Sequence, residues 1–326
     1  MTIIRTLVLF FSIFLAWNAS AQQVPLLKPS TTVPPKLLSS RSVVLYDYRL
    51  TQDELNDFQH GFQRIGIDAI AYFPDDVVYA GKDGQLAYLN YFNERAISFI
   101  VFLQKIGDTY RFTVTPFNGK PSLVDTDQAA WQVSNRRMNE LLTTVIQESW
   151  SSQKKENYLV NEFAETDILV DAVKGKRQEF YAIDLKVDNL AVPKFGVVAM
   201  DTVLENFFAK NYPLKYKTVD FGSDEQELRR KGFLYVLCYV HTRGEAAKQV
   251  LGYDLSKGEK SYASIAFPDG QLQLKVLPKD EIVYKFYFRH IDNGNIFLGT
   301  KWDADVNWLD ALRNHVLGFK QEAKIN

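Results

Sequence analysis

Cysteine is almost absent from this chain of 326 residues, because Cys238 is the only one. A single cysteine excludes an intramolecular disulfide. Small extracellular domains usually rely on several disulfides, whereas a chain of this length can bury a sufficient apolar core without them. Cys238 lies in the apolar run FLYVLCYV, where the sequence predicts a buried and unreactive thiol.

An excess of charge of one sign is also missing. The chain has 38 basic and 39 acidic side chains, which gives a net charge of −1. This balance gives no reason to expect nucleic acid or an anionic membrane surface as a partner. Short basic clusters occur at 174–177 and 229–231, but acidic residues flank both of them. We therefore predict that these clusters are solvated surface.

Long hydrophobic runs are missing after the first residues, since no later run approaches the roughly 20 residues of a membrane-spanning helix. At the start of the chain, Arg5 precedes the apolar stretch Leu7–Trp17, and Ala19-Ser20-Ala21 follows it. This order predicts a cleavable signal peptide over residues 1–21 and a mature chain that begins at Gln22. The alternative is an uncleaved N-terminal anchor. The expected location is the bacterial periplasm, with secretion or the cell surface as alternatives.

Catalytic and cofactor motifs are missing as well. The sequence contains no G-x-S-x-G, no phosphate-binding G-x-x-x-x-G-K-[ST], no G-x-G-x-x-G and no H-E-x-x-H. Its four histidines are dispersed in the sequence, at positions 60, 241, 290 and 315. The segment Asp303–Asn307 resembles the start of a calcium loop, but Trp308 and Asn314 stand where glycine and a carboxylate are required. We predict no cofactor and no metal site.

What is present is a regular alternation of strand and helix patterns. After a proline-containing tether at 22–41, a first α/β module spans 42–150. Thr51 and Glu54 form a capping box that begins its first helix, and Trp131 is placed on its last helix. Strands are expected at 43–46, 67–73, 97–106 and 109–117, and helices from 51, over 83–93 and from 127 to about 150.

A connecting segment at 151–195 with one strand, Glu179–Val187, leads to a second α/β module at 196–326. Further capping boxes at Thr202 and Ser223 begin two of its helices, and a third helix begins at Asp303. The expected strands are 196–200, 216–221, 233–241, 249–255, 262–267, 271–277, 282–291 and 296–301, the last two joined through Asn293-Gly294.

The fold class predicted from this order is mixed α/β (α+β), with two tandem modules that each consist of a mixed sheet and packed helices. Each half ends in a hairpin followed by a helix that carries a tryptophan. We therefore predict an internal duplication in which Trp131 and Trp308 are equivalent.

The final hairpin offers a candidate binding surface. Its first strand carries apolar side chains at alternate positions from Ile282, whereas Lys285, Tyr287 and Arg289 share the other face with Val283. Tyrosine and arginine are enriched at protein interfaces. We predict that Lys285, Tyr287 and Arg289 face outward and bind a partner. The alternative is an ordinary solvated sheet face.

The sequence thus favours an exported, non-enzymatic envelope protein that binds another envelope or cell-surface protein. One alternative is an exported hydrolase with a site built from dispersed carboxylates. In a metal-dependent form it would use Asp184 and Lys186 on the strand 179–187 together with Asp167, Asp171 or Glu179. Another alternative is a small-molecule carrier that uses the cleft between the modules.

Overall fold

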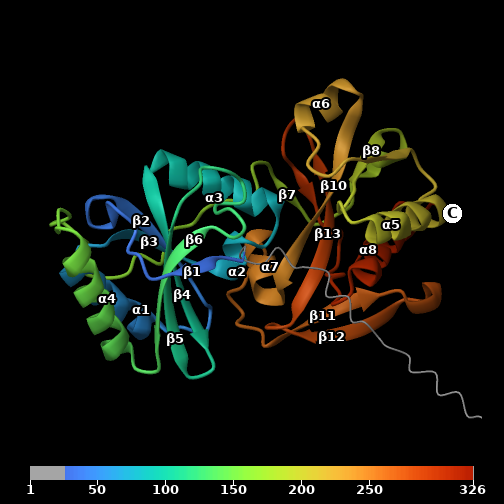
Figure 1. The fold of residues 1–326 in the computed structure, drawn as a ribbon. Coiled ribbons are helices and arrows are strands. Elements are labelled where there is room, and N and C mark those ends of the chain that lie inside the picture. Colours follow the sequence, from blue (N-terminus) through green and yellow to red (C-terminus); the bar gives the residue numbers. More distant parts are fainter. Residues whose placement is uncertain (1–25, 326) are drawn as a thin grey trace, which may run out of the picture.

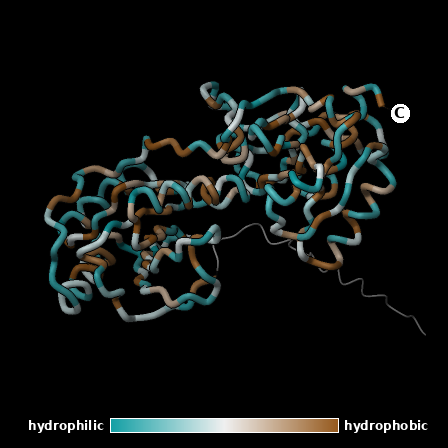
Figure 2. The backbone as a smooth tube through the Cα atoms, turned by 90° about the horizontal axis from the view of Figure 1, so that it is seen from above, coloured by the Kyte–Doolittle hydropathy of each residue, from teal (hydrophilic) through white to brown (hydrophobic). Residues whose placement is uncertain are grey.

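The computed structural model describes residues 26–325, so the expected signal peptide lies outside the described residues. Two sheets of six strands each, with their helices, form two α/β units that lie side by side (Figure 1). Hydrophobic and hydrophilic stretches alternate along the backbone in both units (Figure 2). The predicted mixed α/β class is confirmed. Within residues 26–325, no helix has the length and apolar character needed to cross a membrane.

The first unit contains a sheet in the order β1-β6-β5-β4-β2-β3. Helices α1 and α4 share a core with one face of this sheet, and α2 and α3 share a core with the other. Its strands are β1 (Lys28–Ser30), β2 (Arg41–Tyr46), β3 (Asp68–Pro74), β4 (Ile97–Ile106), β5 (Thr109–Pro116) and β6 (Ala129–Asn135), and its helices are α1 (Gln52–Ile65), α2 (Asp75–Val78), α3 (Lys82–Glu94) and α4 (Met138–Ser152).

The second unit contains a sheet in the order β7-β14-β13-β10-β8-β9. Helices α5 and α8 cover one of its faces. Its strands are β7 (Arg177–Gln178), β8 (Asn189–Pro193), β9 (Tyr216–Val219), β10 (Phe233–Arg243), β13 (Ile282–His290) and β14 (Ile296–Phe297), and its helices are α5 (Val198–Asn211), α6 (Glu225–Arg230), α7 (Gly244–Val250) and α8 (Trp308–Glu322). A separate two-stranded sheet consists of β11 (Ser261–Ala266) and β12 (Gln273–Pro278).

The two sheets have the same topology. In the first, β2 pairs in parallel with β3 and β4, β4 to β6 are antiparallel, and β1 closes the edge in parallel with β6. In the second, β8 pairs in parallel with β9 and β10, the strands β10, β13 and β14 are antiparallel, and β7 pairs in parallel with β14. The second sheet therefore repeats the pairing of the first strand for strand. One difference is an insertion, because α7, β11 and β12 stand where the first unit has the turn Gly107-Asp108 between β4 and β5. The repeated order that the sequence indicated is therefore a repeated topology.

The expected equivalence of the two tryptophans is wrong. Trp131 lies on β6, where its indole is buried and donates a hydrogen bond to Glu148, and Trp308 is the first residue of α8. The helix after β6 begins only at Met138. Trp131 and Met138 are seven residues apart, a spacing that also fits two helical turns. The apolar pattern therefore does not distinguish the short strand β6 from the start of the helix.

Three expected strands, at 179–187, 196–200 and 249–255, are also wrong. Residues 183–186 form a 3₁₀ turn within the segment that was expected as the strand Glu179–Val187. Helix α5 begins at Val198, so Thr202 lies inside it and donates its hydroxyl hydrogen to the carbonyl of Val198 instead of capping it. The expected strand at 249–255 is the end of α7 and a turn. Short apolar runs suit a buried helix as well as a strand, and packing decides between them.

The described part of the expected tether belongs to the first unit. Strand β1 pairs with β6, and Leu37 and Leu38 are buried in the core beneath α1. The connecting segment likewise supplies β7 and β8 to the second sheet. The second sheet therefore uses residues before position 196.

Candidate functional site

Acidic side chains gather where two neighbouring strands of the first unit end. Strands β2 and β3 are parallel neighbours, and the helices that follow them, α1 and α2, pack on opposite faces of the sheet. In open α/β sheets, ligands bind at such divergence points beyond the carboxyl ends of the strands. Asp47 follows β2 here, and Asp75 and Asp76 follow β3.

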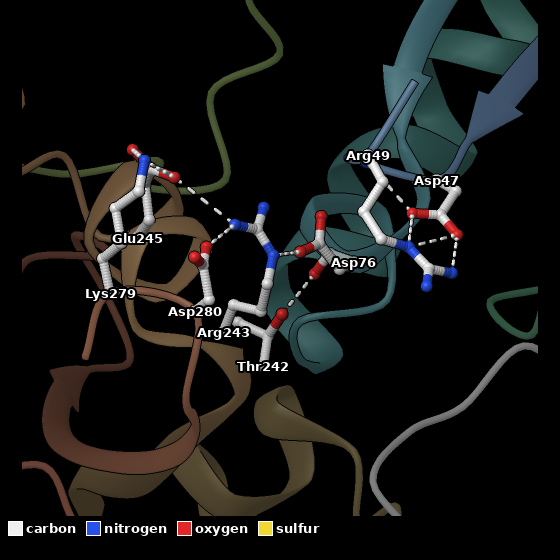
Figure 3. Close-up of polar contacts among 8 residues, drawn as sticks. All are labelled: Asp47, Arg49, Asp76, Thr242, Arg243, Glu245, Lys279 and Asp280. Atoms are coloured by element: carbon white, nitrogen blue, oxygen red, sulfur yellow. Dashed lines mark hydrogen bonds and ion pairs between the residues drawn. The ribbon is translucent and has the colours of Figure 1, made fainter. Parts of the chain in front are cut away.

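Arg243, the last residue of β10 in the second unit, reaches this edge (Figure 3). Its Nε atom lies 2.5 Å from a carboxylate oxygen of Asp76, and its Nη1 atom lies 3.1 Å from Asp280 and 3.3 Å from Glu245. The guanidinium carbon also lies 3.6 Å from the ring centre of Tyr48. Because its side chain is only 10% exposed, Arg243 forms a largely buried contact between the units and is not a free surface charge.

Further hydrogen bonds join the two units beside Arg243. The Thr242 hydroxyl donates to the carbonyl of Asp76 (2.8 Å), and the His241 amide donates to the carbonyl of Ala80 (2.7 Å). A side chain at Gly81 would place its Cβ 2.9 Å from the carbonyl oxygen of Tyr239. The backbones therefore approach closely at a position where only glycine fits.

Burial shifts the protonation of the acidic groups at this edge. It raises the pKa of Asp75 to about 7, and the nearby carboxylates of Asp76 and Asp47 add to this rise. Burial also raises the pKa of Asp76, although Arg243 opposes the rise. For Asp47, burial is outweighed by hydrogen bonds from Arg49, whose Nε lies 2.8 Å from Oδ1, and the pKa is lowered. Asp75 therefore titrates near neutral pH.

The same edge of the second unit is apolar and exposed. It consists of the loops after β8 and β9, the strands equivalent to β2 and β3. Val197, Val198 and Phe221 are 46, 83 and 67% exposed. The two loops touch, because a Cβ placed on Gly196 would lie 3.5 Å from the Phe221 side chain.

Two half-buried aromatic rings extend this surface towards α8. Phe195 directly precedes Gly196, and its ring centre lies 5.0 Å from that of Trp308. We call Phe195, Val197, Val198, Phe221 and Trp308 the strand-end patch. Exposed apolar groups that adjoin one another in this way mark interaction surfaces more often than isolated ones do.

Three carboxylates lie close to Lys194, which directly precedes Phe195 of the strand-end patch. Lys194 forms an ion pair with Glu205 (2.9 Å), and this hydrogen bond and charge, together with Asp220 and Asp201, raise the pKa of Lys194. Asp201 also accepts a hydrogen bond from the Phe195 amide at 2.7 Å. Asp201, Glu205 and Asp220 therefore form an acidic rim beside the patch.

The prediction that Lys285, Tyr287 and Arg289 face outward is wrong. Lys285 is completely buried, Tyr287 is 3% exposed, and the Arg289 side chain is 12% exposed. The Tyr287 hydroxyl donates to Asp83 of the first unit (2.7 Å), and Arg289 lies 3.2 Å from the same carboxylate. Alternation separates two faces of a strand, but it does not distinguish a solvent face from one covered by another unit of the chain.

Lys285 does not reach the first unit at all. It lies within the second unit beside Asp303 and His315, which are equally buried. Asp303 is thus a core residue and does not begin a helix, since α8 is capped by Asn307. The Asp305 carboxylate, two residues further along, forms an ion pair with Lys275 (2.8 Å).

The carboxylates proposed for a hydrolase do not lie on a common strand, because Asp184 is in the 3₁₀ turn. Asp184 accepts a hydrogen bond from the Tyr235 hydroxyl at 3.4 Å. In residues 26–325, no three histidine, cysteine or acidic side chains are grouped so that they could hold a metal ion. Cys238 is half-buried and not fully buried as expected, but burial raises the pKa of its thiol to about 12, which suits an unreactive cysteine.

No protein-family model matches the chain, and neither a curated protein nor a solved structure is significantly similar to it.

Proposed function

We propose that this chain is an exported, non-enzymatic envelope protein that binds a protein partner through the strand-end patch of its second unit. One observation carries the proposal. The strand-end edge that the first unit turns towards the second unit is repeated in the second unit, where the described residues leave it exposed and apolar. An edge that forms a contact in one unit is well suited to form a contact in the other.

The composition of the strand-end patch suits protein binding. Phe221, in the loop after β9, and Val198, the first residue of α5, are exposed, and the half-buried rings of Phe195 and Trp308 adjoin each other. Buried aromatic anchors supply most of the energy at protein interfaces. Removing apolar surface from water contributes roughly 25 cal/mol per Å², so the patch gains from any partner that covers it.

The acidic rim defines the chemistry of the partner. Asp201, Glu205 and Asp220 lie beside the patch, close to Lys194. Charge complementarity favours an apolar segment flanked by lysine or arginine and disfavours one flanked by carboxylates. We therefore assign the patch to a protein segment with an apolar centre and basic flanks.

The export part of the proposal rests on the first 21 residues, and the mature N-terminus tests it. N-terminal sequencing of the protein from the producing cell should begin at Gln22 and find the chain in the periplasmic or extracellular fraction. A protein that retains Met1 and sediments with the membrane would contradict export.

Site-specific photo-crosslinking tests the binding surface. A photoreactive phenylalanine analogue replaces Phe221 in cells that make the full chain, and a control chain carries it at the exposed Asp108 in the turn after β4. Position 221 should give one discrete adduct that Val198→Asp abolishes, whereas Leu274→Asp, at an exposed aliphatic position on β12, should leave it intact. Equal adducts from positions 221 and 108, or none from 221, would refute the assignment.

A further inference from the structure

A polar cluster is enclosed in the core of the second unit and takes no part in the proposed binding. Lys285 on β13, Asp303 before α8 and His315 on α8 have no exposed surface, and Tyr181 is 2% exposed. Fully buried charges are expensive unless they are closely paired. The contacts of these four side chains show how the cluster is arranged.

The lysine amine lies directly against the aspartate carboxyl group. Lys285 Nζ donates to the carbonyls of Phe286 (2.9 Å) and Leu298 (2.7 Å) and lies 2.7 Å from Asp303 Oδ1. The directions of the two groups do not form a hydrogen bond, however, and Oδ1 has no hydrogen-bond donor. The amine is therefore close to the carboxyl group without being held in the usual in-line ion-pair geometry.

The second carboxyl oxygen has two donors. His315 Nδ1 lies 2.9 Å from Asp303 Oδ2, and the Tyr181 hydroxyl lies 3.3 Å from it. Burial, together with the neighbouring Lys285 charge, lowers the pKa of His315 to about 4, so its ring is neutral at pH 7. Lys285 Nζ also lies 3.4 Å from Nδ1, but the carboxylate oxygen is closer and can only accept, so we assign the ring hydrogen to Nδ1.

We propose that Lys285 and Asp303 condense to form an intramolecular isopeptide bond. The ammonium group first transfers a proton to the carboxylate, which gives a neutral amine and a carboxylic acid. Nζ then attacks Cγ, and negative charge collects on Oδ2. A second amine proton passes to the hydroxyl oxygen, which leaves as water. The products are one secondary amide and one water molecule, and the reaction needs no oxidant, reductant or cofactor.

The site supplies what this reaction requires. Burial favours the neutral amine, since it lowers the pKa of Lys285. The donors on Oδ2 stand where charge develops in the tetrahedral intermediate, as in an oxyanion hole. The fold holds the reacting groups in contact, which replaces a collision between separate molecules. Although burial opposes it, the Lys285 charge lowers the pKa of Asp303, which favours the carboxylate, so the bond forms slowly, after proton transfer to that carboxylate.

The bond would give the chain a covalent link without a second cysteine. It would join β13 to the segment immediately before α8, whose first residue, Trp308, belongs to the strand-end patch. Replacing two buried charges with an amide also removes the cost of keeping them out of water. The link would thus fix the base of α8 in a protein that cannot form an intramolecular disulfide.

Peptide mapping of the mature protein tests the inference. Trypsin does not cleave after an acylated lysine, so the linked protein should yield residues 280–289 joined to residues 302–313 in one branched peptide, lighter by one water than the two separate segments. Intact mass alone is ambiguous, because an N-terminal Gln22 and the pair Asp269-Gly270 can each cyclise with loss of a small molecule. The branched peptide and its fragmentation spectrum decide.

Two variants separate the chemistry from the fold. Lys285→Arg keeps a cation but lacks the amine, so the branched peptide should disappear. Tyr181→Phe removes one donor from Oδ2 and should slow the appearance of the branched peptide in freshly made protein several-fold, while circular dichroism stays unchanged. Folded wild-type protein that still yields separate peptides 280–285 and 302–313 after prolonged incubation would overturn the inference.

Discussion

Replacement of Arg243 by methionine is the sharpest test of how the two units are held together. Methionine retains most of the side-chain volume and removes the charge. It leaves Asp76 with a carboxylate that is 18% exposed and has lost its guanidinium partner. Removing one partner of a buried ion pair costs about 3–5 kcal/mol. Because both groups keep some contact with water, we expect Arg243→Met to lower the free energy of unfolding by about 3 kcal/mol, a value that includes the lost stacking on Tyr48.

Urea denaturation followed by tryptophan fluorescence and by circular dichroism measures this loss. The matched control is Lys279→Ala, because the ion pair of Lys279 with Glu245 is about one-third exposed on both sides. Such pairs contribute about 1 kcal/mol or less. The double variant Arg243→Met/Asp76→Asn should recover part of the loss, since it removes the stranded charge.

A loss for Arg243→Met no larger than that of the Lys279→Ala control would refute this reasoning. The ion pairs at the junction would then be solvated, and the apolar contact of Ala246 with the first unit would hold the units together instead. A large loss that Asp76→Asn does not reduce would show that Arg243 acts through Tyr48, Glu245 or Asp280 and not through Asp76.

Three further outcomes follow from the structure. The folded protein should lose stability as the pH rises from about 4 to about 7, because burial raises the pKa of Asp75 to about 7 and the folded state binds a proton that the unfolded state releases; Asp75→Asn should flatten this part of a curve of melting temperature against pH. Thr51→Ala should cost about 1 kcal/mol in urea denaturation, since the Thr51 side chain caps α1 and exchanges hydrogen bonds with Glu54. A reductant should leave the melting temperature of the monomer unchanged, because Cys238 has no cysteine to pair with.

The elements that the sequence predicted well carry two agreeing local signals. The capping box at Thr51 and the apolar spacing after it both indicate a helix, and α1 begins and ends accordingly. Gly107-Asp108 lies between two strand patterns, and β4 and β5 form the expected hairpin. Strand β10 is apolar on both faces and lies inside the second sheet, between β13 and β8.

The elements that were missed had one ambiguous signal each. The apolar run before Asp201 fitted a strand, and this reading hid the start of α5 and with it two residues of the strand-end patch, Val197 and Val198. A usable signal was Gly196 directly before the two valines, because a glycine there is as compatible with a loop as with a strand. The paired Phe221-Gly222 after β9 could also have indicated a loop.

The candidate site could not be derived from a single sequence, because it depends on which surface each unit covers. Tyr287 and Arg289 have the composition of an interface, and Asp83 of the first unit is the group they contact. Their partner lies about 200 residues away in the chain, and no local pattern encodes a contact of that range. Lys285 shares their strand face, but it belongs to the core, because the segment from 298 to 305 covers it.

The repeated topology explains why the second unit has the free surface. Each unit presents the loops after its two parallel neighbour strands, and only the first unit has a neighbour placed to receive them. At that edge the first unit carries Asp76, whose carboxylate pairs with Arg243 of the second unit, which is consistent with a contact made in every molecule. The second unit carries exposed valine and phenylalanine inside an acidic rim. Covering apolar groups that are exposed to water lowers the free energy. The asymmetry between two otherwise matching edges is therefore what directs the search for a partner to Phe221 and the residues around it.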